Sequence, residues 1–327
     1  MEESQEREEW TLVARKPYFG LPTACPICLP VYMYLKLARF PFRMDFNSTY
    51  PDSDQIPYIE SGGYVAYNNE SGGVIQHLKE DDILNLDTEF CSIPEWISME
   101  AMISSWLVDA ITYELWLGSD GSSAFKIYYS DLPWLIGKVL FAKQEYTVKQ
   151  RLGITKENAE PREKEIYKRA KIAYGALSTR LGEQEFLFED RPSSLDALFL
   201  GHVIFTIQAL PEASVLRSSL LEHGNLIRYA EKHKNNFLDA GSSSSSVPRF
   251  PSDSSSSTPR RGPSNFSSKP KRKPKREKTE EEKTFKRRAK YFLATQVIAI
   301  LLFLSVMGGY DFSEVDVGDD DEGYGYD

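Results

Sequence analysis

Apolar residues follow a helical pattern most densely between Arg191 and Pro211. Ser193 with Asp196 three residues later is typical of a helix N-cap and its capping-box partner, and the two flanking prolines allow a helix of about four turns. The apolar positions are Leu195, Ala197, Leu198, Phe199, Leu200, Val203, Ile204, Phe205 and Ile207. A helix without a polar face must be covered on all sides, so the pattern predicts the central helix of a helical domain.

The chain beyond Pro94 is helical in pattern up to about Leu238. Apolar residues recur at helical spacing in four further segments, namely 95–117, 132–151, 161–181 and 213–238. This part of the sequence therefore predicts an all-helical domain.

The preceding part alternates between strand and helix patterns. The expected elements are a strand at 11–14, a helix after the loop 22–30, a strand at 42–46, a hairpin formed by 56–59 and 64–67, and a helix opening near Val74. Strand, helix, strand, hairpin and helix is the element order of a thioredoxin-like fold. The fold class expected is an α/β thioredoxin-like domain followed by an all-α domain.

The C-terminal part changes composition sharply. Residues 239–290 are rich in Ser and Pro and then basic, which predicts a disordered linker. Residues 291–310 carry no Asp, Glu, Lys or Arg until the acidic tail 311–327 begins. Twenty residues of helix reach about 30 Å, enough to cross a bilayer core, so the pattern predicts a transmembrane tail anchor.

Charge changes the interpretation of this C-terminal part. The net charge is −9, but 269–290 holds twelve Lys/Arg and four Glu, a local +8 that leaves −17 elsewhere. Alone, the basic run would suit a nuclear-localisation or nucleic-acid patch. Because it lies directly before the apolar span, we expect it to hold the preceding domain in the cytosol and to bind no nucleic acid.

Composition sets further bounds. Hydrophobic residues make up 41% of the 327 residues, enough for about two domains with sizeable cores. Residues 1–9 are acidic and resemble neither a secretory signal nor a matrix presequence. Three cysteines do not form a disulfide framework, which favours a reducing compartment. The four histidines are scattered without a paired-ligand spacing, so no metal site is expected.

Two motifs in the helical half resemble the metaxin branch of the glutathione-transferase-like proteins: Ser194–Ala197 followed by Gly201 and His202, and the segment 225–233. The resemblance implies a thioredoxin-like domain at 10–85, with Pro57 in the place of a cis proline, and a helical domain at 92–238. It also implies a mitochondrial outer-membrane protein, single-pass, whose N-terminal domain faces the cytosol.

Metaxins are similar to receptor subunits of the sorting and assembly machinery. The resemblance therefore implies a non-enzymatic protein without a cofactor, taking part in outer-membrane protein import. Its expected partners are the β-barrel subunit and other subunits of that machinery, β-barrel precursors such as porin, and outer-membrane lipid.

Two pairs of residues could carry chemistry instead. Cys25 and Cys28 stand where the first helix should begin and resemble the Cys-Pro-x-Cys of glutaredoxins; a helix N-terminus stabilises a thiolate there. Glu70 and Ser71 lie where glutathione transferases hold the γ-glutamyl end of glutathione, although the loop before them is two residues longer. Equally, the two cysteines can be small packing residues.

Three function classes therefore remain open. The first is the import component, and the second is a membrane-tethered glutathione transferase or thiol oxidoreductase using Cys25. The third is a tail-anchored adaptor of the endoplasmic reticulum. A short apolar span suits either thin membrane, and only the resemblance favours mitochondria.

Overall fold

The computed structural model describes residues 9–47, 53–188, 190–238 and 295. The chain divides into two units, Met1–Phe250 and Pro251–Asp327, and the first contains all the described residues except Thr295, which is helical. Residues 1–8 of the predicted acidic tail 1–9, the linker 239–290, the rest of the membrane span 291–310 and the acidic tail 311–327 lie outside the described residues. Within the described part, the helices are too short or too polar to cross a bilayer.

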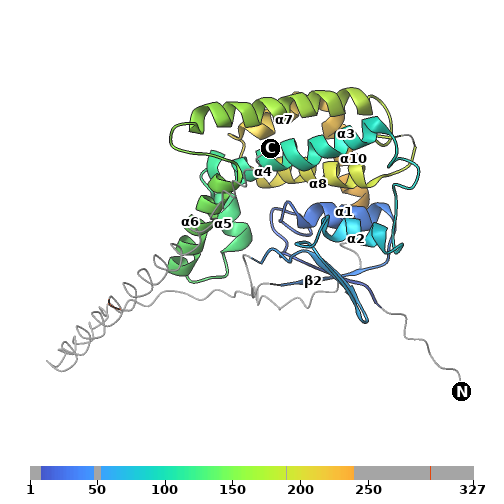
Figure 1. Ribbon diagram of the computed structural model, residues 1–327, viewed down its shortest axis with the longest axis horizontal. Coiled ribbons are helices and arrows are strands. Elements are labelled where there is room, and N and C mark those ends of the chain that lie inside the picture. Colours follow the sequence, from blue (N-terminus) through green and yellow to red (C-terminus); the bar gives the residue numbers. More distant parts are fainter. Residues whose placement is uncertain (1–8, 48–52, 189, 239–294, 296–327) are drawn as a thin grey trace, which may run out of the picture. The chain divides into compact units, whose positions relative to one another are not determined.

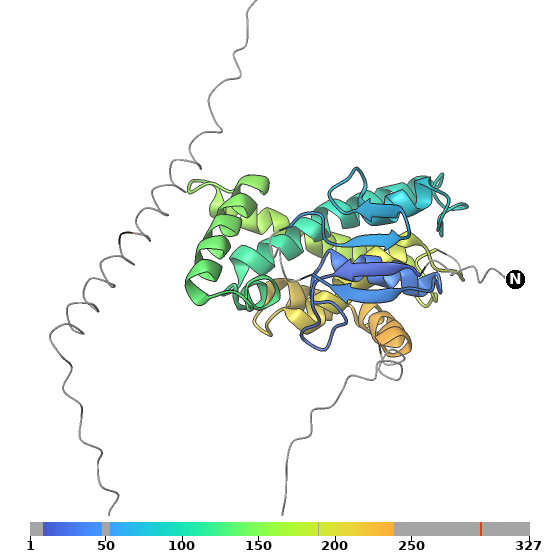
Figure 2. The same ribbon diagram turned by 90° about the horizontal axis from the view of Figure 1, so that it is seen from below.

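The N-terminal half contains a four-stranded sheet in the order β2-β1-β3-β4. The central strand β1 pairs in parallel with β2 and antiparallel with β3, which pairs antiparallel with β4 (Figure 2). Their bounds are Thr11–Ala14, Arg43–Phe46, Tyr58–Ser61 and Tyr64–Tyr67 for β1 to β4. The predicted order of elements is confirmed, as is the cis bond between Ile56 and Pro57.

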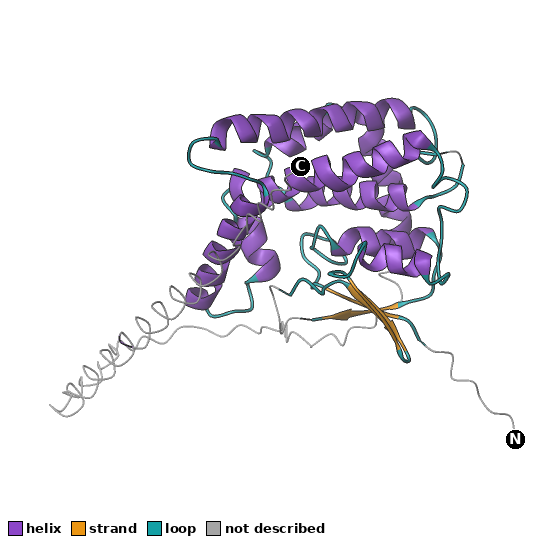
Figure 3. Ribbon diagram, viewed as in Figure 1, coloured by secondary structure: helices purple, strands orange, loops and turns teal. Residues whose placement is uncertain are grey.

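Two helices cover the sheet on the side of the helical half: α1 (Cys28–Leu37) and α2 (Gly73–Glu80) (Figures 1 and 3). Almost every side chain of α1 is buried, because the sheet lies on one side of the helix and the helical half on the other. The predicted boundary between residues 85 and 92 falls in the loop between α2 and the next helix.

The second half is helical from Pro94 onward. Its helices are α3 (Pro94–Met102), α4 (Val108–Tyr113), α5 (Ser122–Tyr128), α6 (Trp134–Arg151), α7 (Ala159–Leu181), α8 (Ser194–Ala209), α9 (Val215–Leu221) and α10 (Gly224–Leu238). The π-helical segment η1 (Ile103–Leu107) joins α3 to α4, and a second one, η2 (Glu114–Gly118), continues α4, which together give the one long helical run that the pattern predicts.

The structure differs from the sequence pattern at two places in this half. The segment 213–238, expected as one helix, is broken between α9 and α10, where Asn225 donates through Nδ2 to the carbonyl of Ser178 at 2.8 Å. The short helix α5 is absent from the predicted elements. Its Ser123 hydroxyl donates to the carbonyl of Ala209 at 2.6 Å, a tertiary contact that a local pattern does not reveal.

Helix α8 begins as the pattern predicts, with Ser193 and Asp196 forming a capping box. Asp196 is fully buried, and its carboxylate accepts from the amides of Ser193 (2.9 Å) and Leu187 (2.8 Å) and from the hydroxyl of Tyr229 (2.6 Å). Burial raises the pKa of Asp196, while these hydrogen bonds act in the opposite direction. The carboxylate therefore ties the start of α8 to α10.

A second buried carboxylate joins the two halves at the same helix end. Asp87, from the loop after α2, accepts from the amide of Ser194 at 2.7 Å and from its hydroxyl. Lys79 of α2 forms an ion pair with Asp87 and donates to the Ser194 hydroxyl at 3.0 Å. Because all these groups are buried or nearly so, losing one partner leaves the others unsatisfied, a cost of several kcal/mol.

Farther along α8, Gly201 and His202 have separate structural uses. His202 is buried and shares a 2.7 Å hydrogen bond with the hydroxyl of Tyr174 in α7, and burial lowers its pKa to about 3. Gly201 faces Pro30 of α1: a Cβ at this position would lie 2.7 Å from Cγ and 2.8 Å from the backbone nitrogen of Pro30. The absence of a side chain at Gly201 lets α1 and α8 touch.

We predict that Gly201→Ala destabilises the protein by separating α1 from α8. Overpacking of this kind costs about 1–3 kcal/mol. Gly175→Ala in α7 is the matched control, since a Cβ there has no heavy atom within 4 Å and gains about 1 kcal/mol in helix propensity. Denaturant unfolding of both variants measures the difference. Equal stability of the two would show that Pro30 moves aside freely.

Candidate functional site

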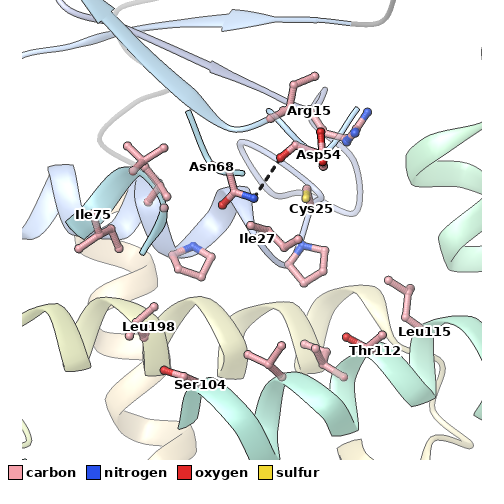
Figure 4. Close-up of a pocket in the computed structure, with 18 of the residues that line it drawn as sticks. Arg15, Cys25, Ile27, Asp54, Asn68, Ile75, Ser104, Thr112, Leu115 and Leu198 are labelled. Atoms are coloured by element: carbon pink, nitrogen blue, oxygen red, sulfur yellow. Dashed lines mark hydrogen bonds between the residues drawn. The ribbon is translucent and has the colours of Figure 1, made fainter. Parts of the chain in front are cut away.

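A cavity of about 620 Å³ lies between the thioredoxin-like half and the helical half. Figure 4 shows the two walls: Arg15, Cys25, Ile27, Asp54, Asn68 and Ile75 on the sheet side, and Ser104, Thr112, Leu115 and Leu198 on the helical side. The packing of α1 on α8 fixes the distance between these walls. The lining is predominantly apolar with a few polar groups, which is typical of a ligand pocket.

Cys25 is the cysteine that lines this cavity. The loop before α1 places its sulfur 3.5 Å from the hydroxyl of Tyr128. The Arg15 guanidinium lies over the Tyr128 ring, 4.9 Å from its centroid, and donates to the carbonyl of Ser53 at 2.9 Å. Only 1% of Cys25 is exposed, so the sulfur lies under the cavity surface.

The surroundings of Cys25 favour its thiolate. Burial by itself raises the pKa of Cys25, but the hydrogen bond from Cys28, the positive charge of Arg15 and the Tyr128 hydroxyl outweigh it and lower the pKa to about 6. Burial and the neighbouring Cys25 raise the pKa of Cys28 well above its usual value. Both cysteines are free thiols. A low-pKa thiol beside a protonated one is an arrangement suited to nucleophilic attack or thiol–disulfide exchange.

The second candidate pair lies elsewhere. Glu70 and Ser71 are exposed and do not line the cavity. The Glu70 carboxylate accepts from the amide of Tyr67 at 3.3 Å and lies 3.4 Å from Nε2 of His77. Gly72, in the left-handed region at φ 82°, precedes α2 without a side-chain cap. The structure therefore places Cys25 in the cavity wall, with the buried Cys28 beside it, and leaves the acid–serine pair outside the cavity.

Arg15 and Tyr128 complete the site, and the sequence pattern does not single them out. Arg15 directly follows β1, a position near the start of α1 in a thioredoxin-like fold, so its charge is a signal that could have been noticed. Tyr128 lies 103 residues from Cys25, in the unpredicted helix α5, and no sequence signal points to it. Among the described residues, no group of three or more His, Cys, Asp and Glu is placed to hold a metal ion.

Family models match both halves. Residues 26–121 match the glutathione S-transferase N-terminal domain, and residues 170–233 match the glutathione S-transferase C-terminal domain. Among solved structures, glutathione transferase GSTFuA2 from Phanerochaete chrysosporium is similar at 11% identity and a TM-score of 0.48, over 71% of this chain and 98% of that one.

Similar curated proteins indicate a narrower family than the domain models do. The chain is 63% identical over 324 residues to the Arabidopsis thaliana "Mitochondrial outer membrane import complex protein METAXIN", covering 98% of this chain and 100% of that protein. It is 25% identical to Metaxin-1 of Mus musculus, over 89% of this chain and 86% of the relative. Metaxin-2 of Homo sapiens is 23% identical, over 64% of this chain and 81% of that protein.

We predict that alkylation of Cys25 by iodoacetamide rises with pH around a midpoint near 6, because the thiolate is the attacking species. Arg15→Met should move this midpoint upward, since it removes a charge that stabilises the thiolate. A midpoint higher by about one pH unit lowers the thiolate fraction by roughly twofold at pH 7 and by nearly tenfold at about pH 5. Arg15→Lys keeps the charge and is the control. Peptide mass spectrometry in a Cys91→Ser background measures the rates, and an unmoved midpoint in Arg15→Met would contradict the assignment.

Proposed function

The chain belongs to the metaxin family, and we propose that it is a non-enzymatic component of protein import at the mitochondrial outer membrane. The observation that carries the proposal is the 63% identity to the Arabidopsis import-complex protein along nearly the whole of both chains. Identity at this level along the whole length supports a shared role as well as a shared fold.

More specifically, we propose that the thioredoxin-like domain 10–85 and the helical domain 92–238 face the cytosol and bind β-barrel precursors or the barrel subunit of the sorting and assembly machinery. Unassembled barrel strands expose apolar faces and unpaired edges, which must be shielded until the barrel closes. A cytosolic domain anchored through residues 291–310, with linker 239–290 and tail 311–327, would hold them at the membrane.

The site geometry supports binding over catalysis. Glu70 and Ser71, the residues that would hold glutathione by resemblance, lie outside the cavity. The sulfur of Cys25 is covered, with 1% of the residue exposed, so a substrate has little access without movement of the cavity wall. A glutathione-transferase frame that serves binding is consistent with both observations.

A second candidate function is thiol chemistry at Cys25, favoured by the lowered pKa of its thiol. The raised pKa of Cys28 would suit a resolving thiol, as in dithiol oxidoreductases. Membrane-tethered glutathione transferase activity belongs to the same class. Incubation of the purified protein with glutathione and a test electrophile separates this class from the import function.

We predict that mitochondria lacking this protein assemble porin more slowly, several-fold, than wild-type mitochondria. The physical reason is the aggregation of unshielded barrel precursors. Import of radiolabelled porin, followed by native electrophoresis of the assembled complex, measures the rate. Normal assembly without the protein would refute the import function.

The same assay tests the second candidate. Cys25→Ser combined with Cys28→Ser should restore porin assembly to nearly the wild-type rate, because serine keeps the size but cannot perform thiol–disulfide exchange. Rescue by the wild type and failure of the serine variant, at equal protein levels, would favour the thiol function instead.

The proposed anchor has its own test. Removing 291–327 should release the protein from membranes into the soluble fraction, since the apolar segment 291–310 is lost. The melting temperature of the remaining protein should not change. Alkaline carbonate extraction of mitochondria measures the release. A truncated protein that stays in the carbonate pellet would rule out a single anchor at 291–310.

A further inference from the structure

Helix α6 carries an apolar stripe on the side that faces away from the rest of the protein. The helix lies beside α5 at the margin of the described body (Figures 1 and 2). Its buried residues are Gly137 and Val148. The opposite side of the helix presents four exposed residues at spacings i, i+4, i+7 and i+11, namely Leu135, Val139, Ala142 and Tyr146. A surface helix normally turns such a stripe toward the core, so this one is unusual.

The exposure of this stripe is large. Half of Leu135 and 65% of Tyr146 are accessible to solvent, and Trp134 at the start of the helix is 70% exposed. We call the surface formed by residues 134–146 on this side the α6 face. Exposed apolar surface of this extent, concentrated on one helix, marks an interaction site more often than a solvent face.

The charges of α6 are mostly positive. Helix α6 contains four Lys/Arg (Lys138, Lys143, Lys149 and Arg151) and one Glu, a net charge of +3, in a chain whose net charge is −9. Lys138 and Lys143 lie on either side of the apolar stripe. An apolar stripe bordered by lysines, with Trp at one end and Tyr near the other, is the pattern of an interfacial helix.

The α6 face lies outside the matched transferase domains. The two family models cover 26–121 and 170–233, and α6 falls between them. The stripe is therefore not explained by the packing needs of the shared frame. The opposite side of α6 supplies Gln144, Thr147 and Val148 to the cavity wall, so one helix connects the cavity to the exposed face.

We propose that the α6 face rests on an anionic phospholipid surface. The apolar stripe lies at the boundary between headgroups and acyl chains, and Lys138 and Lys143 extend along it to reach the lipid phosphates. Charge complementarity selects an anionic surface, because the net charge of +3 on α6 attracts lipid phosphates. The inference rests on the proposed outer-membrane location. It adds a second membrane contact, which orients the body and brings the α6 wall of the cavity next to the bilayer.

The test uses the full chain, synthesised in the presence of vesicles of equal parts phosphatidylcholine and phosphatidylserine. Cys25, Cys28 and Cys91 are replaced by serine, and a single new cysteine at Val139→Cys or Tyr146→Cys carries an environment-sensitive fluorophore. Lipids with a spin label near the headgroup should quench both probes. Ile172→Cys on α7 is the matched control: Ile172 is 50% exposed, as apolar as Val139, and far from the α6 face in sequence, and its probe should stay unquenched.

A second part of the test removes the positive charges beside the stripe. Lys138→Gln and Lys143→Gln should each lower the ratio of lipid-contacting to free α6 by about fivefold, and pure phosphatidylcholine vesicles should lower quenching further. Unquenched α6 probes on a chain that floats with the vesicles would overturn the proposal while leaving the import function standing. Burial of the α6 probes from solvent as the protein concentration rises without vesicles would also overturn the proposal. It would identify a contact between copies of this chain instead.

Discussion

The contact between α1 and α8 at Pro30 and Gly201 is the constraint on which the rest of the described structure depends. Helix α1 is buried between the sheet and α8, and the two helices approach so closely that a single methyl group at Gly201 would meet the Pro30 ring. Because protein interiors are close-packed, this approach fixes the separation of the two halves. The cavity between them, and the position of Cys25 in its wall, follow from that separation.

Two buried carboxylates hold the start of α8 in place, and one of them, Asp87, also joins the two halves. Asp196 closes the start of α8 through donors from the preceding loop and from α10, and Asp87 binds Ser194 while pairing with Lys79 of α2. Each carboxylate has several donors, which compensates the loss of hydration on burial. Removing one donor would leave a charge or a hydroxyl unsatisfied, so these contacts contribute to the specificity of the domain arrangement as well as its stability.

The two described halves match glutathione S-transferase domain models, and a cysteine lines the cavity between them. Cys25 keeps a lowered pKa through Cys28, Arg15 and Tyr128, whereas the acid–serine pair stands outside the cavity. The fold therefore supplies a rigid, partly apolar cavity in a family whose curated relative is named as part of an import complex. A binding role uses the rigidity of such a frame without needing the chemistry that the frame supports elsewhere.

The amino-acid sequence was sufficient to predict the order of the elements and the capped, fully covered helix α8, because each depends on short-range periodicity or local capping. The cis proline at Pro57 was expected from the family resemblance alone. The sequence also indicated Cys25 and Cys28. The three-dimensional packing was needed to show that Tyr128 of the short helix α5 stands beside Cys25, that Glu70 and Ser71 miss the cavity, and that α6 turns an apolar stripe outward. These features arise from contacts between residues far apart in the chain, and a local pattern carries no information about which of its faces will find a partner.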